Sequence, residues 1–232
     1  MINYDEWHSQ LEVDYDVDTP WHNFFDSIKN ELDFENARIL EIGCGRGGFA
    51  NYFLDLYSNK IKEYVAIDYS AEAVRKAEFF IGSKYKNIKF STGDIQNIYY
   101  SDNSFDYVFS FETIEHVPKP HVAVNELYRV LKHGGKLVLT TPNYFGFFGL
   151  YRIALRLKGK RWTEVGQPIN KFVMMPLTYY WLRKAKFKKI KAMSEIISCP
   201  SPFSNKVIQF KWKKPKFLLN WFGLQSFFTA QK

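Results

Sequence analysis

The sequence predicts an α/β protein built around a mainly parallel sheet. Three observations predict this fold class: apolar segments of four to seven residues alternate with longer segments of helical periodicity, the alternation repeats four times by residue 142, and glycine-rich or proline-containing turns separate the units. Parallel strands need long crossover connections, which are usually helices, so this alternation indicates βαβ units.

The elements follow in order along the chain. In "DTPWHNFFDSIKNEL", Asp18 or Thr19 is expected to cap a helix that accepts Pro20 in its first turn. Runs of apolar residues predict strands at 37–43, 63–69, 87–92, 105–111 and 136–142. Apolar residues at helical spacing predict helices at 48–57, 70–82 and 121–135. Beyond these, we expect a helix at 174–187 and strands at 188–196 and 224–232.

Charge is distributed unevenly along the 232 residues, a length that suits one domain. The net charge of +8 divides into −9 for residues 1–36, +1 for 37–142 and +16 for 143–232. A balanced middle between biased ends suggests a standard core with specialised attachments. Two cysteines cannot form a disulfide framework, which indicates a reducing compartment. We expect no signal peptide and no membrane span, because the N-terminus is polar and no uncharged apolar run reaches about 18 residues.

A glycine loop, "EIGCGRGG", joins the first predicted strand to the first predicted helix of the core. It satisfies the dinucleotide pattern G-x-G-x-x-G through Gly43, Gly45 and Gly48, and an acid-x-G-x-G-x-G pattern through Glu41, Gly43, Gly45 and Gly47. Glycine has no Cβ, so the backbone there can turn tightly and approach a ligand closely. A plain strand-to-helix turn is the alternative interpretation.

Two acidic residues follow the next two strands. Asp68 lies 23 residues after the middle glycine of the loop, and a carboxylate there can accept both ribose hydroxyls of a nucleoside. Because Ser70 can cap the following helix, we interpret Asp68 as a ribose ligand. In "TGDI", Asp94 can accept the exocyclic amine of adenine and the Ile95 amide can bond a ring nitrogen; an ordinary Gly-Asp turn is the alternative.

Five stretches in order resemble the class I S-adenosylmethionine-dependent methyltransferases of type 11/12, and are similar to ubiquinone-biosynthesis O-methyltransferases. They are "ILEIGCGRGG", "YVAIDYS", "TGDI", "FDYVFSFETIEHV" and "ELYRVLKHGGKLVLTTPN". The resemblance implies a Rossmann-like, seven-stranded methyltransferase sheet, mostly parallel, with helices on both faces and an antiparallel last strand supplied by "LQSFFTAQK". It also implies S-adenosylmethionine, rather than NAD, as the cofactor.

The resemblance assigns roles to residues of the core. By the family pattern, Glu41, Gly43, Gly45 and Gly47 face the methionine part of the cofactor, Asp68 holds the ribose, Asp94 and Ile95 face the adenine, and Ser110 and Phe111 line the methyl-transfer site. The chain departs from the family at Lys186-Phe187, where Gly-Phe is usual. The helix before it must therefore end without the favoured left-handed glycine.

The resemblance also divides the chain into functional segments. We expect a single methyltransferase domain over 1–232. It would comprise an N-terminal helical segment (1–36), a cofactor-binding core (37–142) and substrate cap insertions at 143–175 and 196–222.

Three ionisable residues follow the predicted strand 105–111: Glu112, Glu115 and His116. If they form a helical turn, all three share one face near the methyl group. His116 is then a general base or an acceptor-positioning group, assisted by Glu112 or Glu115. In a second interpretation, the three hold a divalent cation at the acceptor hydroxyl. In a third, the acids only complement a helix N-terminus, and His116 packs against a proline-rich turn.

The metal interpretation draws on a further resemblance, because "FETIEHV" and "TTPNY" are similar to segments of small-RNA 2′-O-methyltransferases. That family's next histidine ligand would fall near "INKF", where this chain has Asn170. Asparagine is a poorer ligand, so a divalent metal is not favoured.

The last third of the chain interleaves basic and apolar residues in "NYFGFFGLYRIALRLKGKRW" and "VIQFKWKKPKFLLNWFGL". Three interpretations stay open: a lid over the acceptor pocket, a basic amphipathic helix at an anionic membrane surface, or a binding surface for an anionic acceptor. RNA ranks last, since no RNA-binding motif is present.

These observations together predict an enzyme that transfers a methyl group from S-adenosylmethionine. The expected acceptor is a small or lipid-linked hydroxylated molecule such as a sugar or phenol, methylated on oxygen. The alternatives are an RNA 2′-O-methyltransferase with a divalent metal and a non-catalytic, cofactor-binding partner subunit. The expected location is cytoplasmic, with peripheral membrane contact as one option. The sequence leaves the oligomeric state open.

Overall fold

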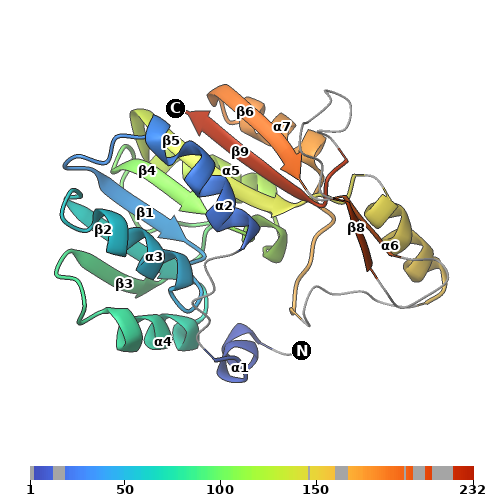
Figure 1. Cartoon of the computed structure of the whole chain (residues 1–232), viewed down its shortest axis with the longest axis horizontal. Coiled ribbons are helices and arrows are strands. Elements are labelled where there is room, and N and C mark those ends of the chain that lie inside the picture. Colours follow the sequence, from blue (N-terminus) through green and yellow to red (C-terminus); the bar gives the residue numbers. More distant parts are fainter. Residues whose placement is uncertain are drawn as a thin grey trace.

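The computed structural model describes residues 3–12, 19–145, 147–159, 167–195, 197–200, 207–210 and 222–232. Its centre is a seven-stranded sheet in the order β3-β2-β1-β4-β5-β9-β6, which confirms the predicted fold class (Figure 1). The strands are β1 (Arg38–Ile42), β2 (Glu63–Asp68), β3 (Ile88–Thr92), β4 (Phe105–Ser110), β5 (Leu131–Pro142), β6 (Lys188–Glu195) and β9 (Gln225–Gln231). A separate antiparallel pair is formed by β7 (Ile197–Pro200) and β8 (Val207–Phe210).

Strand direction follows the predicted pattern. The pairs β1–β2, β2–β3, β1–β4 and β4–β5 are parallel. Strand β9 is antiparallel to both of its neighbours, β5 and β6. The chain order reverses between β1 and β4, and in open α/β sheets ligands bind beyond the carboxyl ends of the strands at such a point.

Helices cover both faces of the sheet (Figure 1). They are α1 (Tyr4–Ser9), α2 (Pro20–Ile28), α3 (Gly48–Tyr57), α4 (Ala71–Ile81), α5 (Pro120–Val130), α6 (Phe147–Leu157) and α7 (Met175–Lys184), with short 3₁₀ turns η1 (Lys29–Glu31) and η2 (Ile114–His116). Thr19 caps α2 by accepting from the His22 amide, as expected, and Pro20 stands in its first turn. Asp18, the other predicted cap, lies outside the described residues.

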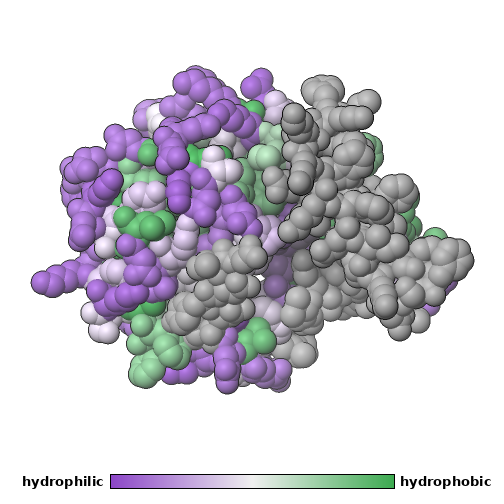
Figure 2. Space-filling view, viewed as in Figure 1, coloured by the Kyte–Doolittle hydropathy of each residue, from purple (hydrophilic) through white to green (hydrophobic). Residues whose placement is uncertain are grey.

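Two apolar layers hold these helices to the sheet. On one face, buried aromatic rings of α2 and α3 pack on β1 and β4, with Phe25, Phe53 and Phe109 fully buried. On the other face, aliphatic residues of α5 and α7 pack on the same strands, with Leu127 and Leu182 fully buried. Hydrophilic residues cover most of the described surface in the view of Figure 2. Among the described residues, no helix has the length and apolarity needed to cross a bilayer.

Two predicted boundaries were wrong. The helix expected at 121–135 ends at Val130, and the strand expected at 136–142 begins at Leu131. Leu131 is extended and pairs with Phe105 of β4 across a register shift. Gly134 next to it has a φ of 83°. The backbone therefore leaves the helix four residues before the glycine pair that we expected to end it, because a strand partner is available there.

The attachments flank the carboxyl edge of the sheet. Helix α6 and the β7–β8 pair lie together beyond the ends of β5 and β6, while α1 lies beside α4 (Figure 1). Both predicted cap insertions are only partly described, since residues 146, 160–166, 196, 201–206 and 211–221 lie outside the described ranges. The segment boundaries expected from the sequence stay a prediction.

Candidate active site

The glycine loop after β1 takes a left-handed backbone conformation, which is consistent with the tight turn that the sequence predicts. Gly43, Gly45 and Gly47 have φ values of 81°, 53° and 85°. A Cβ on Gly43 would lie 2.1 Å from Oγ1 of Thr113, so this position must be glycine for the loop to pack against the turn after β4. The Gly43 amide donates to the Ile67 carbonyl, which ties the loop to the end of β2.

Glu41 lies in β1 with its side chain buried. Its Oε2 accepts a 2.8 Å hydrogen bond from the Tyr64 hydroxyl of β2. Burial raises the pKa of Glu41 to about 8, and the hydrogen bond from Tyr64, which lowers the pKa, offsets only part of this increase. Near neutral pH the carboxyl is therefore largely protonated, and a cationic ligand beside it would favour its ionisation.

Asp68 ends β2 with both carboxylate oxygens on backbone amides. Oδ2 accepts from Gly45 at 2.8 Å and Oδ1 accepts from Ser70 at 2.9 Å. Burial raises the pKa of Asp68, against the effect of these donors. Ser70 caps α4 by accepting from Ala73, as expected, so Asp68 is not needed as the cap. Because a carboxylate has about four lone-pair sites, acceptor capacity remains for a ligand.

The turn after β3 lies directly beside Asp68, because the Gly93 amide donates to the Asp68 carbonyl at 2.9 Å. Asp94 is half-buried and Ile95 is buried. The Asp94 carboxylate accepts from the backbone and side-chain amides of Gln96. The structure thus brings the ends of β1, β2 and β3 into one continuous ledge, which we call the cofactor ledge: residues 43–47, 68–70 and 93–96.

Ser110 and Phe111 lie where β4 ends, next to the cofactor ledge. The Phe111 ring packs against Phe49 at the start of α3, with ring centroids 4.3 Å apart. Ser110 is fully buried, and its Oγ has no hydrogen-bond partner among the described residues. Buried hydroxyls are normally paired, so a buried, unpartnered oxygen at this edge suits a site that binds a polar ligand.

Glu112 differs from the expectation of a shared helical face. Only Ile114–His116 form a helical turn, and Glu112 stands before it with a φ of 47°. Thr140 of β5 holds it there: the Glu112 amide donates to the Thr140 carbonyl at 3.2 Å, and the Thr140 hydroxyl donates to Glu112 Oε1 at 2.7 Å. The acid is half-buried and is oriented by β5 rather than by a helix.

Glu115 and His116 form a buried pair. Oε1 of Glu115 lies 3.5 Å from Nε2 of His116, and Oε2 accepts from the Thr141 hydroxyl at 3.1 Å. Nδ1 of His116 lies 2.7 Å from the Ile169 carbonyl, so this nitrogen must carry a proton and donate. Burial lowers the pKa of His116 to about 4, which leaves a neutral imidazole near pH 7 with its Nε2 lone pair toward Glu115.

Neighbouring threonines of β5 hold the two glutamates. Glu112 is bonded to Thr140, whereas Glu115 is bonded to Thr141. Among the residues that the structure describes, no three His, Cys, Asp or Glu side chains are grouped as a metal site would require. Asn170 accepts a 3.2 Å bond from the Tyr144 hydroxyl.

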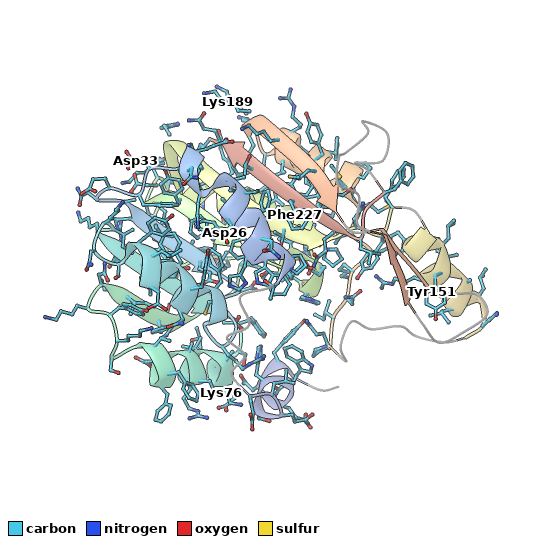
Figure 3. The ribbon with its side chains drawn as sticks, viewed as in Figure 1. Asp26, Asp33, Lys76, Tyr151, Lys189 and Phe227 are labelled. Carbon is cyan, nitrogen blue, oxygen red and sulfur yellow. The ribbon has the colours of Figure 1, made fainter. Side chains whose placement is uncertain are left out.

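The N-terminal helix α1 reaches two parts of the site and is also bonded to α4. The Tyr4 hydroxyl donates to the His116 carbonyl, and burial raises the pKa of this tyrosine to about 12. Asp5 Oδ1 accepts from the Ser70 hydroxyl at 2.7 Å and from the Glu72 amide at 3.1 Å. Lys76 of α4, labelled beside α1 in Figure 3, donates to the carbonyls of His8 and Leu11.

Sequence reasoning missed Tyr4, Asp5, Thr140 and Thr141. The two threonines stand in the "TTPN" stretch that carried part of the resemblance, but nothing local shows that they hold the two glutamates. Tyr4 and Asp5 lie in an acidic segment whose partners are 65 or more residues away. No signal in the sequence identifies those partners.

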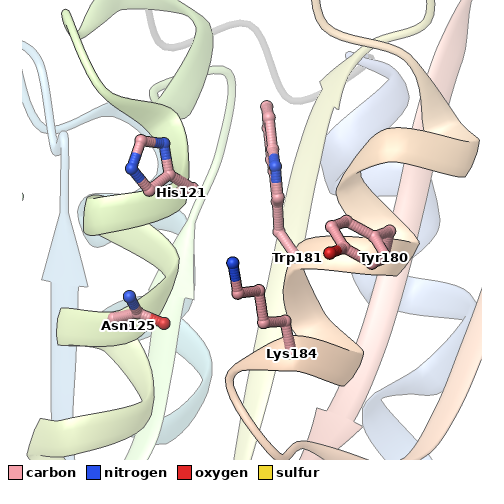
Figure 4. Close-up of a pocket in the computed structure, with 5 residues that line it drawn as sticks. All are labelled: His121, Asn125, Tyr180, Trp181 and Lys184. Atoms are coloured by element: carbon pink, nitrogen blue, oxygen red, sulfur yellow. The ribbon is translucent and has the colours of Figure 1, made fainter.

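Two hollows elsewhere in the described structure contain none of the predicted site residues. One, of about 280 Å³, lies between α5 and α7 and is lined by His121, Asn125, Tyr180, Trp181 and Lys184 (Figure 4). The other borders the amino ends of β1 and β4. The candidate site is therefore defined by its polar contacts and backbone geometry.

Comparison with known proteins identifies the kind of domain. Residues 40–139 match the family model described as a methyltransferase domain. The chain is 26% identical over 179 residues to a tRNA U34 carboxymethyltransferase from Nautilia profundicola, an alignment that covers 75% of this chain and 56% of that protein. It is 31% identical over 119 residues to a ubiquinone biosynthesis O-methyltransferase from Xanthomonas oryzae, covering 51% and 48%.

A crystal structure of a SAM-dependent methyltransferase from Thermotoga maritima has the same fold, with a TM-score of 0.62 at 23% identity over 91% of this chain and 89% of that one. The chain spans about half the length of the curated relatives described above.

Proposed function

Because residues 40–139 match the model of a methyltransferase domain, we propose that the protein transfers a methyl group from S-adenosylmethionine to a hydroxyl oxygen. The acceptor is a small or lipid-linked hydroxylated molecule, such as a sugar or phenol. One observation carries this proposal: a neutral histidine, paired with a buried glutamate, stands beside the end of β4, next to the cofactor ledge.

The residues of the ledge fit the cofactor. Asp68 offers remaining carboxylate lone pairs to the ribose hydroxyls, and the turn with Asp94 and Ile95 lies beside it to receive the adenine. The left-handed glycines let the backbone approach the methionine part, and Glu41 lies buried beneath them near Asp68. When bound, S-adenosylmethionine supplies an electrophilic methyl group on a sulfonium that is already a good leaving group.

The chain then has to place the acceptor in line with that methyl and remove its proton. Because burial lowers its pKa to about 4, His116 is neutral near pH 7 and offers the Nε2 lone pair to the hydroxyl proton as a weak base. Glu115 Oε1, at 3.5 Å, stabilises the resulting imidazolium, while the Ile169 carbonyl keeps the ring oriented through Nδ1. Glu112 is held by Thr140 and can accept a hydrogen bond from the acceptor molecule. The donor is either a second hydroxyl or the reacting hydroxyl, before its proton moves to His116.

The acceptor class rests on charge and position. The block 143–232 carries a net charge of +16, and its helix α6, which carries Arg152 and Arg156 and no acidic residue, lies beyond the carboxyl ends of β5 and β6. A positive surface at the mouth of a site concentrates anionic acceptors and disfavours cationic ones. Together with a proton-accepting histidine, this favours hydroxylated acceptors that bear phosphate or lie on an anionic lipid surface.

A labelled-methyl transfer screen tests the proposal. The panel comprises phenols, sugars, polyprenyl-phosphate-linked sugars, amines and tRNA; tRNA is included because the Nautilia relative is named for it. We expect transfer to a hydroxylated acceptor. His116→Asn should lower the rate about 10²- to 10⁴-fold, the usual loss on removing a general base, with cofactor affinity retained.

Four results would contradict the proposal in different ways. Transfer to amines alone would show that the methylated atom is nitrogen rather than oxygen. Full turnover in His116→Asn would show that His116 is not the general base. Loss of activity with a chelator, restored by Mg²⁺, would favour the metal-dependent alternative. Tight cofactor binding without transfer to any member would favour a non-catalytic partner subunit.

Cellular location stays a prediction. Cys44 is a free, buried cysteine whose pKa is raised by burial, and the side chain of Cys199 lies outside the described part of the chain. We propose a reducing, cytoplasmic compartment, which a fractionation of cells expressing the tagged protein would test.

A further inference from the structure

Helix α6 is oriented unusually for an amphipathic helix. Its Gly149 lies against the Tyr144 carbonyl, where a Cβ would come within 1.8 Å of the oxygen. Its Arg152 turns toward the body of the protein, with the guanidinium 4.0 Å from the centre of the Tyr144 ring and 5.5 Å from that of Phe172. A glycine and a cation, rather than an apolar stripe, therefore form part of the side that faces the protein.

The apolar stripe faces solvent instead. Leu150, Ile153 and Leu157 are 63%, 49% and 84% exposed. At 100° per residue, they lie within about 60° of one another on the helix surface, roughly opposite Arg152. Surface helices normally bury such a stripe in the core, so an outward one marks a binding surface. We call these three residues the α6 stripe.

Cations border the stripe. Arg156 and Lys158 are exposed and, by the same helical spacing, lie on opposite sides of it. No acidic residue occurs from 143 to 159. An apolar stripe between two cationic edges is the arrangement by which a helix lies in the interface of an anionic membrane, with leucines in the acyl boundary and cations at the headgroups.

We propose that α6 docks this protein onto an anionic lipid surface, with the α6 stripe inserted and Arg156 and Lys158 on the headgroups. Charge complementarity selects this occupant: residues 143–159 carry three cations and no acidic residue, which suits a surface of negative headgroups and opposes pairing of α6 with a second copy of itself. The inference concerns where the protein binds, and it holds whichever acceptor is methylated.

Vesicle sedimentation of the full chain tests the proposal directly. One set of vesicles is phosphatidylcholine alone, and the other contains about one-third phosphatidylglycerol. We expect binding to the anionic vesicles at low salt, weakened at high salt as the charges are screened. No binding of the wild type to anionic vesicles at low salt would overturn the proposal.

Two double variants separate the apolar and electrostatic contributions. Leu150→Ser with Leu157→Ser should lower the partition coefficient at least about tenfold on anionic vesicles, because two inserted side chains are lost. Arg156→Gln with Lys158→Gln should lower it about fivefold per cation on anionic vesicles and leave binding to phosphatidylcholine unchanged. Because all four residues are exposed, the fold is expected to survive, and a circular dichroism melt checks it.

Phe79→Ser is the matched control. Phe79 is an apolar side chain that is 75% exposed, but it lies on α4 rather than on α6, so its loss should leave vesicle binding unchanged. Equal losses in Phe79→Ser and the leucine variant would mean non-specific adsorption. A leucine variant that binds vesicles normally but sediments at half the wild-type mass would identify the stripe as a contact between copies. Either result would overturn the membrane proposal.

Discussion

In the cofactor ledge, the single carboxylate of Asp68 would bind both the protein backbone and the ribose of the cofactor. Both of its oxygens already accept a backbone amide, from Gly45 and from Ser70. In Asp68→Asn, one of those amides would face an NH₂ group, and the charge that a ribose hydroxyl would bond is lost. Hydrogen bonds to charged groups contribute about 1.5–3 kcal/mol, so the affinity for S-adenosylmethionine should fall about 10- to 100-fold, measured by titration calorimetry.

Asp102→Asn provides the control for this change. Asp102 is exposed, pairs with Arg129 and stands before β4, at the opposite edge of the sheet. It should bind the cofactor as the wild type does. An Asp68→Asn protein with unchanged affinity would mean that the ribose is held elsewhere.

His116 should make folding stability depend on pH. Its pKa is about 6.5 in the unfolded chain and about 4 in the folded protein, where it is buried. Between these values only the unfolded chain binds the proton, so the free energy of unfolding falls as pH drops from 6.5 to 4, by about 1.4 kcal/mol per pH unit at most. Above 6.5 the contribution is constant.

Two other buried groups change the free energy of unfolding in the opposite direction as the pH falls. Burial raises the pKa of Glu41 and Asp68, so these acids stabilise the fold toward low pH. We therefore expect the effect in the difference between the wild type and His116→Asn, measured by urea denaturation at several pH values. Parallel stability curves from pH 6.5 to 4 would show that His116 is not buried as described.

At the scale of elements, α7 ends with a strained lysine. Lys186 adopts a φ of 76° after the helix, and the Phe187 amide donates back to the Leu182 carbonyl. This is the glycine-type helix ending that the sequence was expected to lack, formed by an exposed lysine. Because the left-handed conformation costs a non-glycine residue about 1–2 kcal/mol, Lys186→Gly should raise the free energy of unfolding by about 0.5–1 kcal/mol, after the entropy of the freer unfolded chain.

Lys184→Gly is the matched comparison. Lys184 is the same residue type, also exposed, but it is helical. Glycine there should lower the free energy of unfolding by about 0.5–1 kcal/mol. Equal effects of the two substitutions in chemical denaturation would contradict the assigned backbone conformation.

Helix α1 should control how fast the cofactor leaves. Asp5 fastens α1 to Ser70 and Glu72, next to Asp68 on the ledge, and those bonds lower the pKa of Asp5. Asp5→Ala removes both bonds, so the fastened state becomes less populated and the dissociation rate of bound S-adenosylmethionine should rise about tenfold in stopped-flow measurements. Glu6→Gln, an exposed acid on the same helix, should leave the rate unchanged. Equal rates in both variants would show that α1 does not cover the site.

How far the sequence predicts this protein depends on the range of the interactions. The positions of Asp68 and the glycines were predictable because they depend on a strand end and a local turn. Glu112 was misplaced because its left-handed backbone is held by Thr140, 28 residues away. The docking of α1 was missed because Tyr4 bonds to His116 across 112 residues. Periodicity and turn chemistry are local, whereas these contacts exist only once the sheet is assembled.

At the scale of the whole molecule, one sheet separates two cores of different composition. Phe25 of α2 anchors the aromatic core: it is fully buried and contacts the rings of Phe49, Phe53 and Phe109. The aliphatic core under α5 and α7 shares β1 and β4 with it. Both layers pack on β1 and β4, so loss of one layer should weaken the other. The single domain expected from the sequence should therefore unfold as one cooperative unit.

Phe25→Ala tests that expectation. Truncating a buried phenylalanine costs about 3–5 kcal/mol. If the chain is one cooperative unit, the most protected amides of α5, on the far face, should lose the same free energy of opening as those of α3 in native-state hydrogen exchange. If the layers unfold separately, only α3 and its neighbours would exchange faster. Phe79→Ala, an exposed phenylalanine on α4, should shift neither set by more than about 0.5 kcal/mol, which separates the loss of the aromatic core from the loss of any phenylalanine.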